Sequence, residues 1–266
     1  MASIRVDTSR LTFQQFTIPG QPTLPADGSG ITALSLDPGV YGFAQTGLPG
    51  FQFEVTAAGV VDFDGAADGF LQGRGTDALT VVGFPVTIDL TALSHGLSPE
   101  VVGSPPALTR DAPHQLQLIP STYLFLLARG LADFGLVVAP DGQLSLTDSA
   151  LAGCAQINGR TLTVTGYDVT FDLTNLSHGL TPELLDNPGV TLGRQTPTTL
   201  HLIPATYNYE LARGTADFGL VVTRDGQLSL TDPTLAGCAQ INGRTLTVTG
   251  YDVTFDLTNL SHGLTP

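Results

Sequence analysis

Residues 151–182 read LAGCAQINGRTLTVTGYDVTFDLTNLSHGLTP, and residues 235–266 repeat this stretch letter for letter. A diverged version occupies residues 73–99, with the sequence GRGTDALTVVGFPVTIDLTALSHGLSP. A short fragment, IRVDTSRL, occupies residues 4–11 and matches only the last strand expected in the stretch. Because the chain is built from repeats of one unit, the fold of this stretch decides the fold of the protein.

The stretch alternates polar and apolar residues in two runs. In residues 161–165 threonines alternate with leucine and valine, and in residues 167–174 Tyr, Val, Phe and Leu alternate with Asp and Thr. A period of two residues predicts strands with one face on a core and the other in water. Asn158-Gly159 predicts a tight hairpin before the first run. Gly166, between the runs, predicts either a second tight turn or a bulge in one long strand.

Other patterns in the unit also predict strands and turns. Each repeat opens with Leu-x-Leu-x-Pro-x-x-Tyr, which predicts a strand, a turn and a second strand and ends at Tyr41, Tyr123 and Tyr207. Asp141-Gly142 predicts a hairpin turn between two apolar runs. No run favours a helix. We therefore predict an all-β fold of three tandem antiparallel β repeats of about 84 residues, each a hairpin-built unit of the sandwich or barrel type.

The predicted boundaries follow tracts rich in Pro and Gly. A partial-repeat strand with its linker takes residues 1–30, and repeat units take residues 31–113, 114–197 and 198–266. The last strand of the unit occurs four times and the rest of the unit three times. We therefore expect residues 4–11 to complete the sheet of the first unit, so that successive repeats exchange a strand. The alternative is that residues 4–11 are the remnant of a longer array from which the chain was trimmed.

The composition argues against some partners. The net charge is −14 and all ten basic residues are arginines, so the surface repels phosphate backbones and nucleic acid is not an expected partner. No apolar run reaches the ~20 residues that span a bilayer, which argues against membrane insertion. The first residues lack the apolar segment of a secretory signal. The cellular location of the protein is left open, and a secreted or cell-surface location is favoured.

The two cysteines, Cys154 and Cys238, occupy the same position in two repeats, and the first repeat has Leu71 there. A leucine at this position marks it as part of the core, so we expect two buried free thiols. Their redox compartment is left open.

Two residue types recur at the end of each unit and are the candidate binding residues: the aspartates Asp89, Asp172 and Asp256, and the histidines His95, His178 and His262. A second aspartate lies four residues before two of these aspartates. Carboxylates four apart on a strand start ~13 Å apart, beyond the ~5–9.5 Å of glycosidase pairs, so a catalytic dyad is not expected. The histidines could form a three-histidine metal ring only if the units closed around an axis.

A third candidate, Asp62, Asp64 and Asp68 in the first unit, has the carboxylates and glycines of a calcium loop. It lacks the Asp-x-Asp-x-Asp-Gly order and the terminal glutamate, and the other repeats do not share it. Turn formation is the competing interpretation. No cofactor and no other metal site is expected.

These features favour a binding or adhesion module that is not an enzyme, is extracellular or on a surface, and acts through multivalency. A glycan or a surface polymer is the expected ligand, although the absence of Trp weakens the carbohydrate version. The alternative is a structural, self-assembling repeat protein of a fibre or surface layer, because spare strands and the absence of Lys invite self-association. No residue set meets the geometric requirements of an enzyme.

Overall fold

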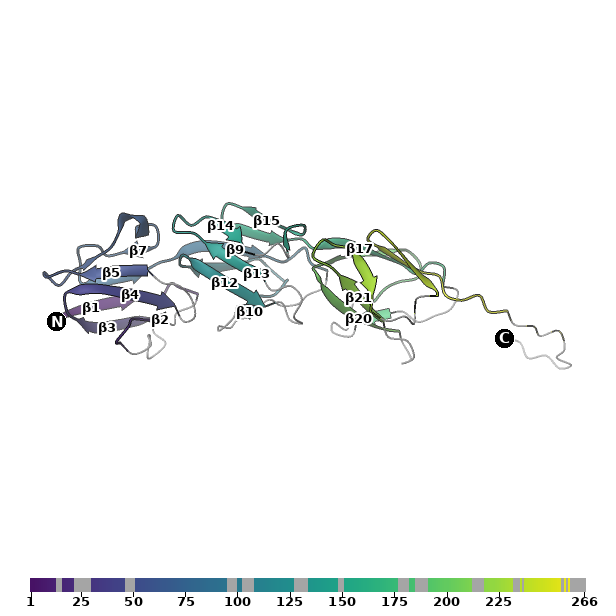
Figure 1. Ribbon diagram of the computed structural model, residues 1–266, viewed down its shortest axis with the longest axis horizontal. Coiled ribbons are helices and arrows are strands. Elements are labelled where there is room, and N and C mark those ends of the chain that lie inside the picture. Colours follow the sequence, from purple (N-terminus) through teal and green to yellow (C-terminus); the bar gives the residue numbers. More distant parts are fainter. Residues whose placement is uncertain are drawn as a thin grey trace. The chain divides into compact units, whose positions relative to one another are not determined.

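The structure, a computed structural model, describes residues 1–12, 16–21, 30–45, 51–94, 100–101, 108–126, 134–147, 151–176, 182–184, 191–211, 218–231, 235, 237–254, 256 and 258. These residues form short strands joined by turns, together with a 3-10 turn, η1 (Gly65–Ala67) (Figure 1). The predicted all-β class is confirmed. Within the described part of the chain, no helix is long and apolar enough to cross a bilayer.

The strands in chain order are β1 (Ala2–Asp7), β2 (Phe16–Thr17), β3 (Ile31–Leu36), β4 (Gly39–Gln45), β5 (Phe51–Val55), β6 (Val61–Asp62), β7 (Leu71–Gln72), β8 (Ala78–Val81), β9 (Phe84–Asp89), β10 (Glu100–Val101), β11 (His114–Leu118), β12 (Ser121–Leu126), β13 (Phe134–Val138), β14 (Leu144–Leu146), β15 (Ala155–Asn158), β16 (Thr161–Val164), β17 (Tyr167–Asp172), β18 (Pro182–Leu184), β19 (Thr198–Leu202), β20 (Ala205–Leu211), β21 (Phe218–Val222), β22 (Leu228–Leu230), β23 (Ala239–Asn242) and β24 (Thr245–Val248).

The strands form six four-stranded sheets, which come as three similar pairs. The first pair has the strand orders β3-β1-β8-β7 and β2-β4-β5-β6. The second has β11-β9-β16-β15 and β10-β12-β13-β14, and the third has β19-β17-β24-β23 and β18-β20-β21-β22. Equivalent sequence takes equivalent positions, so the three predicted repeats share one topology.

One sheet of each pair is mixed. Strand β1 runs antiparallel to β3, from Ala2 opposite Leu36 to Asp7 opposite Ile31, and parallel to β8, with Val6 opposite Leu79. Strands β9 and β17 pair in parallel with β16 and β24 in the same way. The prediction of antiparallel hairpins holds for β7–β8, β15–β16 and β23–β24. Strands β1, β9 and β17 can run parallel to β8, β16 and β24 because no tight turn joins the two strands of each pair. A tight turn would require them to be antiparallel.

The mixed sheets also show the expected strand exchange. Residues 84–89, as β9, come from the end of the predicted first repeat and lie between β11 and β16 of the second. Strand β17 takes the same position in the third pair, and β1 completes the first. Residues 4–7, as part of β1, are therefore paired within a sheet, between β3 and β8. The boundaries of the four predicted ranges stay a prediction.

The glycine between the two strand runs is neither a hairpin turn nor a bulge in one strand. Gly166 (φ +74°) carries the chain from β16 in one sheet to β17 in another. A Cβ at this position would lie 2.9 Å from backbone atoms of His201 and Leu202. Gly83 (φ +65°) occupies the same position between β8 and β9, with backbone atoms of Leu118 3.1 Å from its ideal Cβ. Only glycine combines this conformation with so little space.

The recurring tyrosines stabilise the turn that joins the two sheets of a pair. The Tyr123 hydroxyl donates to the Ile119 carbonyl at 3.0 Å, and the Tyr41 hydroxyl donates to the Asp37 carbonyl at 2.7 Å. Burial raises the pKa of Tyr123, although this hydrogen bond acts in the opposite direction. The predicted strand, turn and strand are present, but the turn links β11 to β12 across two sheets instead of closing a hairpin.

Alternating residues form the core, as the period of two predicts. In β17, Tyr167, Val169 and Phe171 are buried while Asp168 is exposed. The Asn158-Gly159 hairpin is confirmed, with Asn158 opposite Thr161. Cys154 and Cys238 are buried thiols, as expected for core positions.

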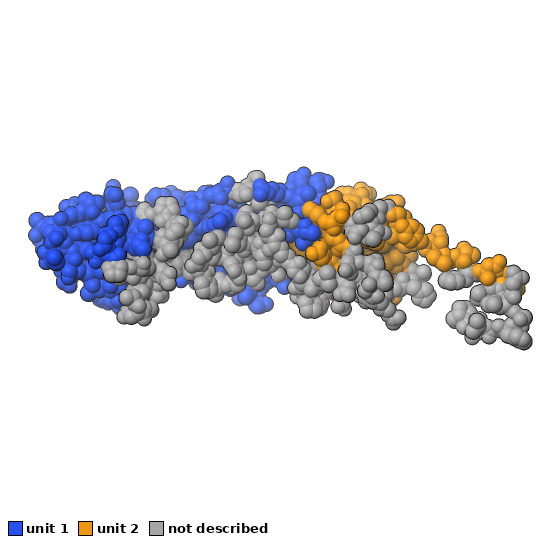
Figure 2. All heavy atoms as spheres, turned by 60° about the horizontal axis from the view of Figure 1, so that its bottom comes forward, with its two compact units in different colours: residues 1–168, 200–206, 222–227 blue, residues 169–199, 207–221, 228–266 orange. Residues whose placement is uncertain are grey.

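The chain forms two compact units, coloured separately in Figure 2. Unit 1 comprises residues 1–168, 200–206 and 222–227, and contains the first two pairs of sheets. Unit 2 comprises residues 169–199, 207–221 and 228–266.

Candidate functional site

The repeated aspartates close a turn at the end of their strands. The Asp172 carboxylate accepts hydrogen bonds from the Thr174 backbone N–H at 3.0 Å and from the Thr174 hydroxyl at 2.6 Å. Asp89 accepts the same pair from Thr91, at 2.9 and 2.7 Å, and Asp256 accepts it from Thr258. An aspartate whose carboxylate accepts a hydrogen bond from the backbone N–H two residues later favours a turn over continuation of the strand. We call this arrangement the Asp–Thr turn.

The hydrogen bonds favour the charged carboxylate. The Thr174 hydroxyl and N–H hold the pKa of Asp172 below its ordinary value, and the Thr258 groups do the same for Asp256. At Asp7 partial burial acts to raise the pKa, but the hydrogen bonds from Ser9 and the charges of Arg5 and Arg10 together outweigh it, and the pKa is lowered. These carboxylates therefore carry their charge at neutral pH while being held by their own loop.

In unit 1 the loop that begins at this turn contacts an edge strand of another sheet. The Ser94 hydroxyl accepts from the His201 N–H at 2.9 Å, and the Ser94 N–H donates to the His201 carbonyl at 3.3 Å. Thr12 and Gln117 make the same two bonds, at 2.7 and 3.2 Å. The Asp–Thr turn therefore sets the direction of a loop whose next residues join two sheets. This contact was not predicted, because its serine and threonine differ between repeats and resemble ordinary loop residues.

The candidate histidines His95, His178 and His262 lie outside the described residues. Each follows directly, in the sequence, a loop that starts at an Asp–Thr turn. Their role in binding, and that of Asp89, Asp172 and Asp256, stays a prediction.

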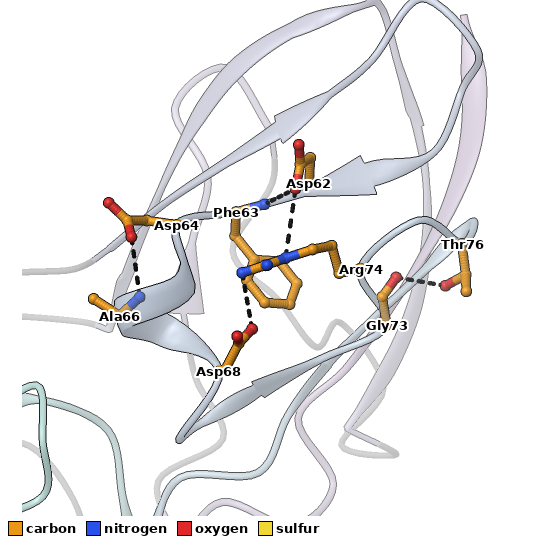
Figure 3. A network of polar contacts seen from close by, with 8 residues as sticks. All are labelled: Asp62, Phe63, Asp64, Ala66, Asp68, Gly73, Arg74 and Thr76. Atoms are coloured by element: carbon orange, nitrogen blue, oxygen red, sulfur yellow. Dashed lines mark hydrogen bonds and ion pairs between the residues drawn. The ribbon is translucent and has the colours of Figure 1, made fainter.

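The acidic cluster of the first repeat is organised around an arginine (Figure 3). The Arg74 guanidinium lies 2.8 Å from the Asp68 carboxylate and 3.5 Å from that of Asp62. It also covers the Phe63 ring, 4.9 Å from the centroid. Asp64 instead accepts from the Ala66 N–H at 3.0 Å and caps η1. The arginine thus lies where a cation between Asp62 and Asp68 would lie.

In the described part of the chain, no three His, Cys, Asp or Glu side chains gather as a metal site. The calcium candidate stays a prediction. Asp64 makes the contact of a turn, and Asp62 and Asp68 pair with Arg74. The sequence-based calcium prediction did not include Arg74. This arginine follows the cluster in the sequence, and its positive charge could have indicated a counter-ion for the aspartates.

A shallow hollow of about 360 Å³ borders this cluster. It is lined by three acidic side chains and by apolar and amide groups: Glu54, Asp62, Asp64, Val40, Phe53, Phe63 and Gln52. The second and third repeats have Ser145 and Thr147, or Ser229 and Thr231, where the first has Asp62 and Asp64. These two acidic lining residues are therefore specific to the first repeat.

One polar pair in unit 1 was missed by the sequence analysis. The His201 Nδ1 and the Asp168 carboxylate lie 2.7 Å apart, with side chains 45% and 72% exposed. In the second repeat the corresponding residues, Gln117 and Pro85, lie opposite each other and cannot form an ion pair. No direct sequence signal marks this pair, because the two residues are far apart in the chain and meet only through strand exchange.

Comparison with known proteins gives a limited result. No family model matches the chain, and no curated protein matches it. Solved structures do match, among them the pilus adhesin SpaC from Lactobacillus rhamnosus GG and a C-terminal fragment of the same adhesin. They are 14% and 13% identical, with TM-scores of 0.28 and 0.29 over 93% of this chain. The aligned part spans 43% of the first structure and 95% of the second. Similarity this low does not establish a shared function.

Proposed function

We propose that the protein is a non-enzymatic, surface-exposed or extracellular β-repeat module that binds a glycan or a surface polymer through several equivalent loops. The supporting observation is the Asp–Thr turn, which recurs with nearly the same hydrogen-bond lengths at Asp89, Asp172 and Asp256. Each turn is followed by nearly the same sequence, and equivalent segments on repeated sheets would give weak contacts a combined strength.

In this proposal the aspartates and histidines have different roles. The aspartates Asp89, Asp172 and Asp256 position the loop, because their carboxylates already accept two hydrogen bonds from within it. The histidines that follow, His95, His178 and His262, contact the ligand. The acidic surface, with a net charge of −14, favours neutral or cationic polymers over anionic ones.

The test measures binding of the labelled full chain to glycans and cell-surface polymers immobilised at high and low density. Multivalent binding is expected to weaken by about 100-fold or more when the ligands are too sparse for simultaneous contact. Changing His95, His178 and His262 together to Ala should remove binding, whereas each single change should leave a weaker signal.

A matched control is His201→Ala, which removes an exposed histidine outside the repeated loops. It should bind like the unchanged chain. Absence of binding to every ligand, or equal affinity at both densities, would contradict the proposal.

A further inference from the structure

The chain enters and leaves the second pair of sheets through two neighbouring strands. It enters through β9, which follows β8 of the first pair after Val82 and Gly83. It leaves through β16, which is followed by Thr165, Gly166 and then β17 of the third pair. Strands β9 and β16 are adjacent and parallel, as are β1 and β8 in the first pair and β17 and β24 in the third.

The register of β9 and β16 places the entry and exit points at opposite ends of the two strands. Thr87 lies opposite Thr161, so Gly83 comes four residues before this position and Gly166 comes five residues after it. At about 3.3 Å per residue the two glycines are about 30 Å apart along the strands, while neighbouring strands are only about 4.8 Å apart across the sheet. Tension between the two glycines is therefore directed mainly along the strands.

The direction of the tension decides how the pairing of β9 and β16 can break. A force that acts on two parallel strands at their opposite ends slides one strand past the other, so the evenly spaced hydrogen bonds between them share the force. A force that acts at the same end of both strands peels them apart, and the hydrogen bonds then break one after another. Sliding therefore requires the higher force.

The first hydrogen bond of this parallel pairing is the same in the three pairs of sheets. The donor N–H and the acceptor carbonyl are 2.9 Å apart in each case: Thr87 to Arg160, Thr170 to Arg244, and Arg5 to Asp77. The side chains differ between the first repeat and the other two, but the backbone bond does not. The parallel pairing is therefore a common feature of the repeat.

Buried side chains add to the resistance against sliding. Val86 and Ile88 in β9 and Leu162 in β16 are fully buried. On its other side β9 pairs with β11 over five positions. For β9 to slide, these apolar side chains have to leave the core while hydrogen bonds on both sides of the strand break.

The links between successive pairs of sheets are short. Each has only two residues outside the strands, Val82-Gly83 and Thr165-Gly166. The backbone of His201, which lies against Gly166, also bonds Ser94. Tension therefore passes from β8 to β9 and from β16 to β17 through the covalent chain, and it passes from β9 to β16 through the parallel pairing.

We propose that the protein carries tension along its chain, with the parallel pairs β1–β8, β9–β16 and β17–β24 acting as shear clamps. A shear clamp is a pair of neighbouring parallel strands that is pulled at opposite ends. While β9–β16 holds, the strands from β10 to β15 lie outside the path of the force. Its rupture releases the chain between Gly83 and Gly166, which extends to about 290 Å at ~3.5 Å per residue. This function needs no ligand and is independent of the binding proposed above.

The test pulls on the full chain with optical tweezers in two directions. Handles on Pro85→Cys and Asp168→Cys pull the clamp along its strands, because Pro85 lies at the start of β9. Handles on Ala92→Cys and Asp168→Cys keep the exit point but move the entry point beyond the end of β9, so the strands are peeled apart. All three positions are exposed, and Cys154 and Cys238 are changed to Ala in both chains.

The rupture force should be about threefold higher or more along the strands than in the peeling direction, because three paired positions share it. The released length should be close to the full extension of the chain between the two handles. Equal rupture forces in the two directions would overturn the proposal. This comparison changes only exposed residues and the two cysteines, and no ligand is present, so its outcome does not depend on the proposed binding function.

Two leucine variants, pulled through Pro85 and Asp168, separate a role in the clamp from a general role in stability. Leu162 in β16 and Leu136 in β13 are both fully buried, but only Leu162 belongs to the clamp. Leu162→Ala and Leu136→Ala should lower the urea midpoint by similar amounts. Only Leu162→Ala should lower the rupture force, by about a third, because it weakens one of three paired positions. Circular dichroism checks that both variants are folded, and an equal loss of force in both would contradict the proposal.

Discussion

The Tyr209 ring stacks on Phe218 with centroids 5.1 Å apart, and its hydroxyl is buried with no hydrogen-bond partner among the described residues. Equivalent stacks in unit 1 pair Phe43 with Phe51 and Phe125 with Phe134. The third repeat therefore places a hydroxyl where the other two have only a phenyl ring. Burial, and secondarily Tyr207, raise the pKa of Tyr209, so the hydroxyl stays protonated.

We expect Tyr209→Phe to stabilise the protein by about 1–3 kcal/mol, the cost of burying an unsatisfied hydroxyl. Urea unfolding with an unchanged m-value measures this. Tyr123→Phe is the matched control and should destabilise by about 1 kcal/mol, because its hydroxyl bonds the Ile119 carbonyl. If both changes shift the midpoint in the same direction, the assignment of the unsatisfied hydroxyl is wrong.

Gly166→Ala should be strongly destabilising. The positive φ costs an alanine about 1–2 kcal/mol, and the crowding against the backbone of His201 and Leu202 adds about 1–3 kcal/mol. Gly159→Ala is the comparison, because its φ is +57° and nothing lies within 4 Å of its ideal Cβ. It should show only the conformational cost. Thermal unfolding of both variants measures the difference, and equal losses would show that the crowding has relaxed.

The Asp–Thr turn gives a pH-dependent prediction. The folded-state pKa of Asp172 is below its unfolded value, so the turn contributes stability above the unfolded value of about 3.9. That contribution is lost as the pH falls through the folded-state pKa. Nuclear magnetic resonance titration should show the Asp172 pKa rising toward its ordinary value in Thr174→Val and staying low in Thr174→Ser. An unchanged pKa in Thr174→Val would mean that another group holds the charge.

Arg74 gives a prediction about calcium. Because its guanidinium occupies the space between Asp62 and Asp68, calcium should not measurably raise the melting temperature of the unchanged chain. Arg74→Gln removes the charge and should change the stability by only about 0–1 kcal/mol, as both ion pairs are exposed. Any calcium-dependent rise should be larger in this variant. If calcium clearly raises the melting temperature of the unchanged chain but not that of Arg74→Gln, the result would contradict this prediction and support a calcium site.

Much of the secondary structure could be predicted because its causes are local. The alternation in 167–172 is a property of neighbouring residues, and the Asn158-Gly159 turn depends on two residues that tolerate positive φ. The role of Asp172 was harder to predict. Its carboxylate lay on the expected face, but the bonds to Thr174 depend on the backbone leaving the strand at that residue.

The parallel pairing of β1 with β8, the link at Gly166 and the pair of His201 with Asp168 needed the tertiary structure. The two pairings join residues distant in the chain, and at Gly166 no local preference fixes which sheet the next strand enters. Sequence by itself determined that YDVTFD at 167–172 has one apolar face when it is extended, since its side chains alternate with a period of two. Tertiary structure alone decided that β17 lies between β19 and β24, because strand pairing depends on residues distant in the chain.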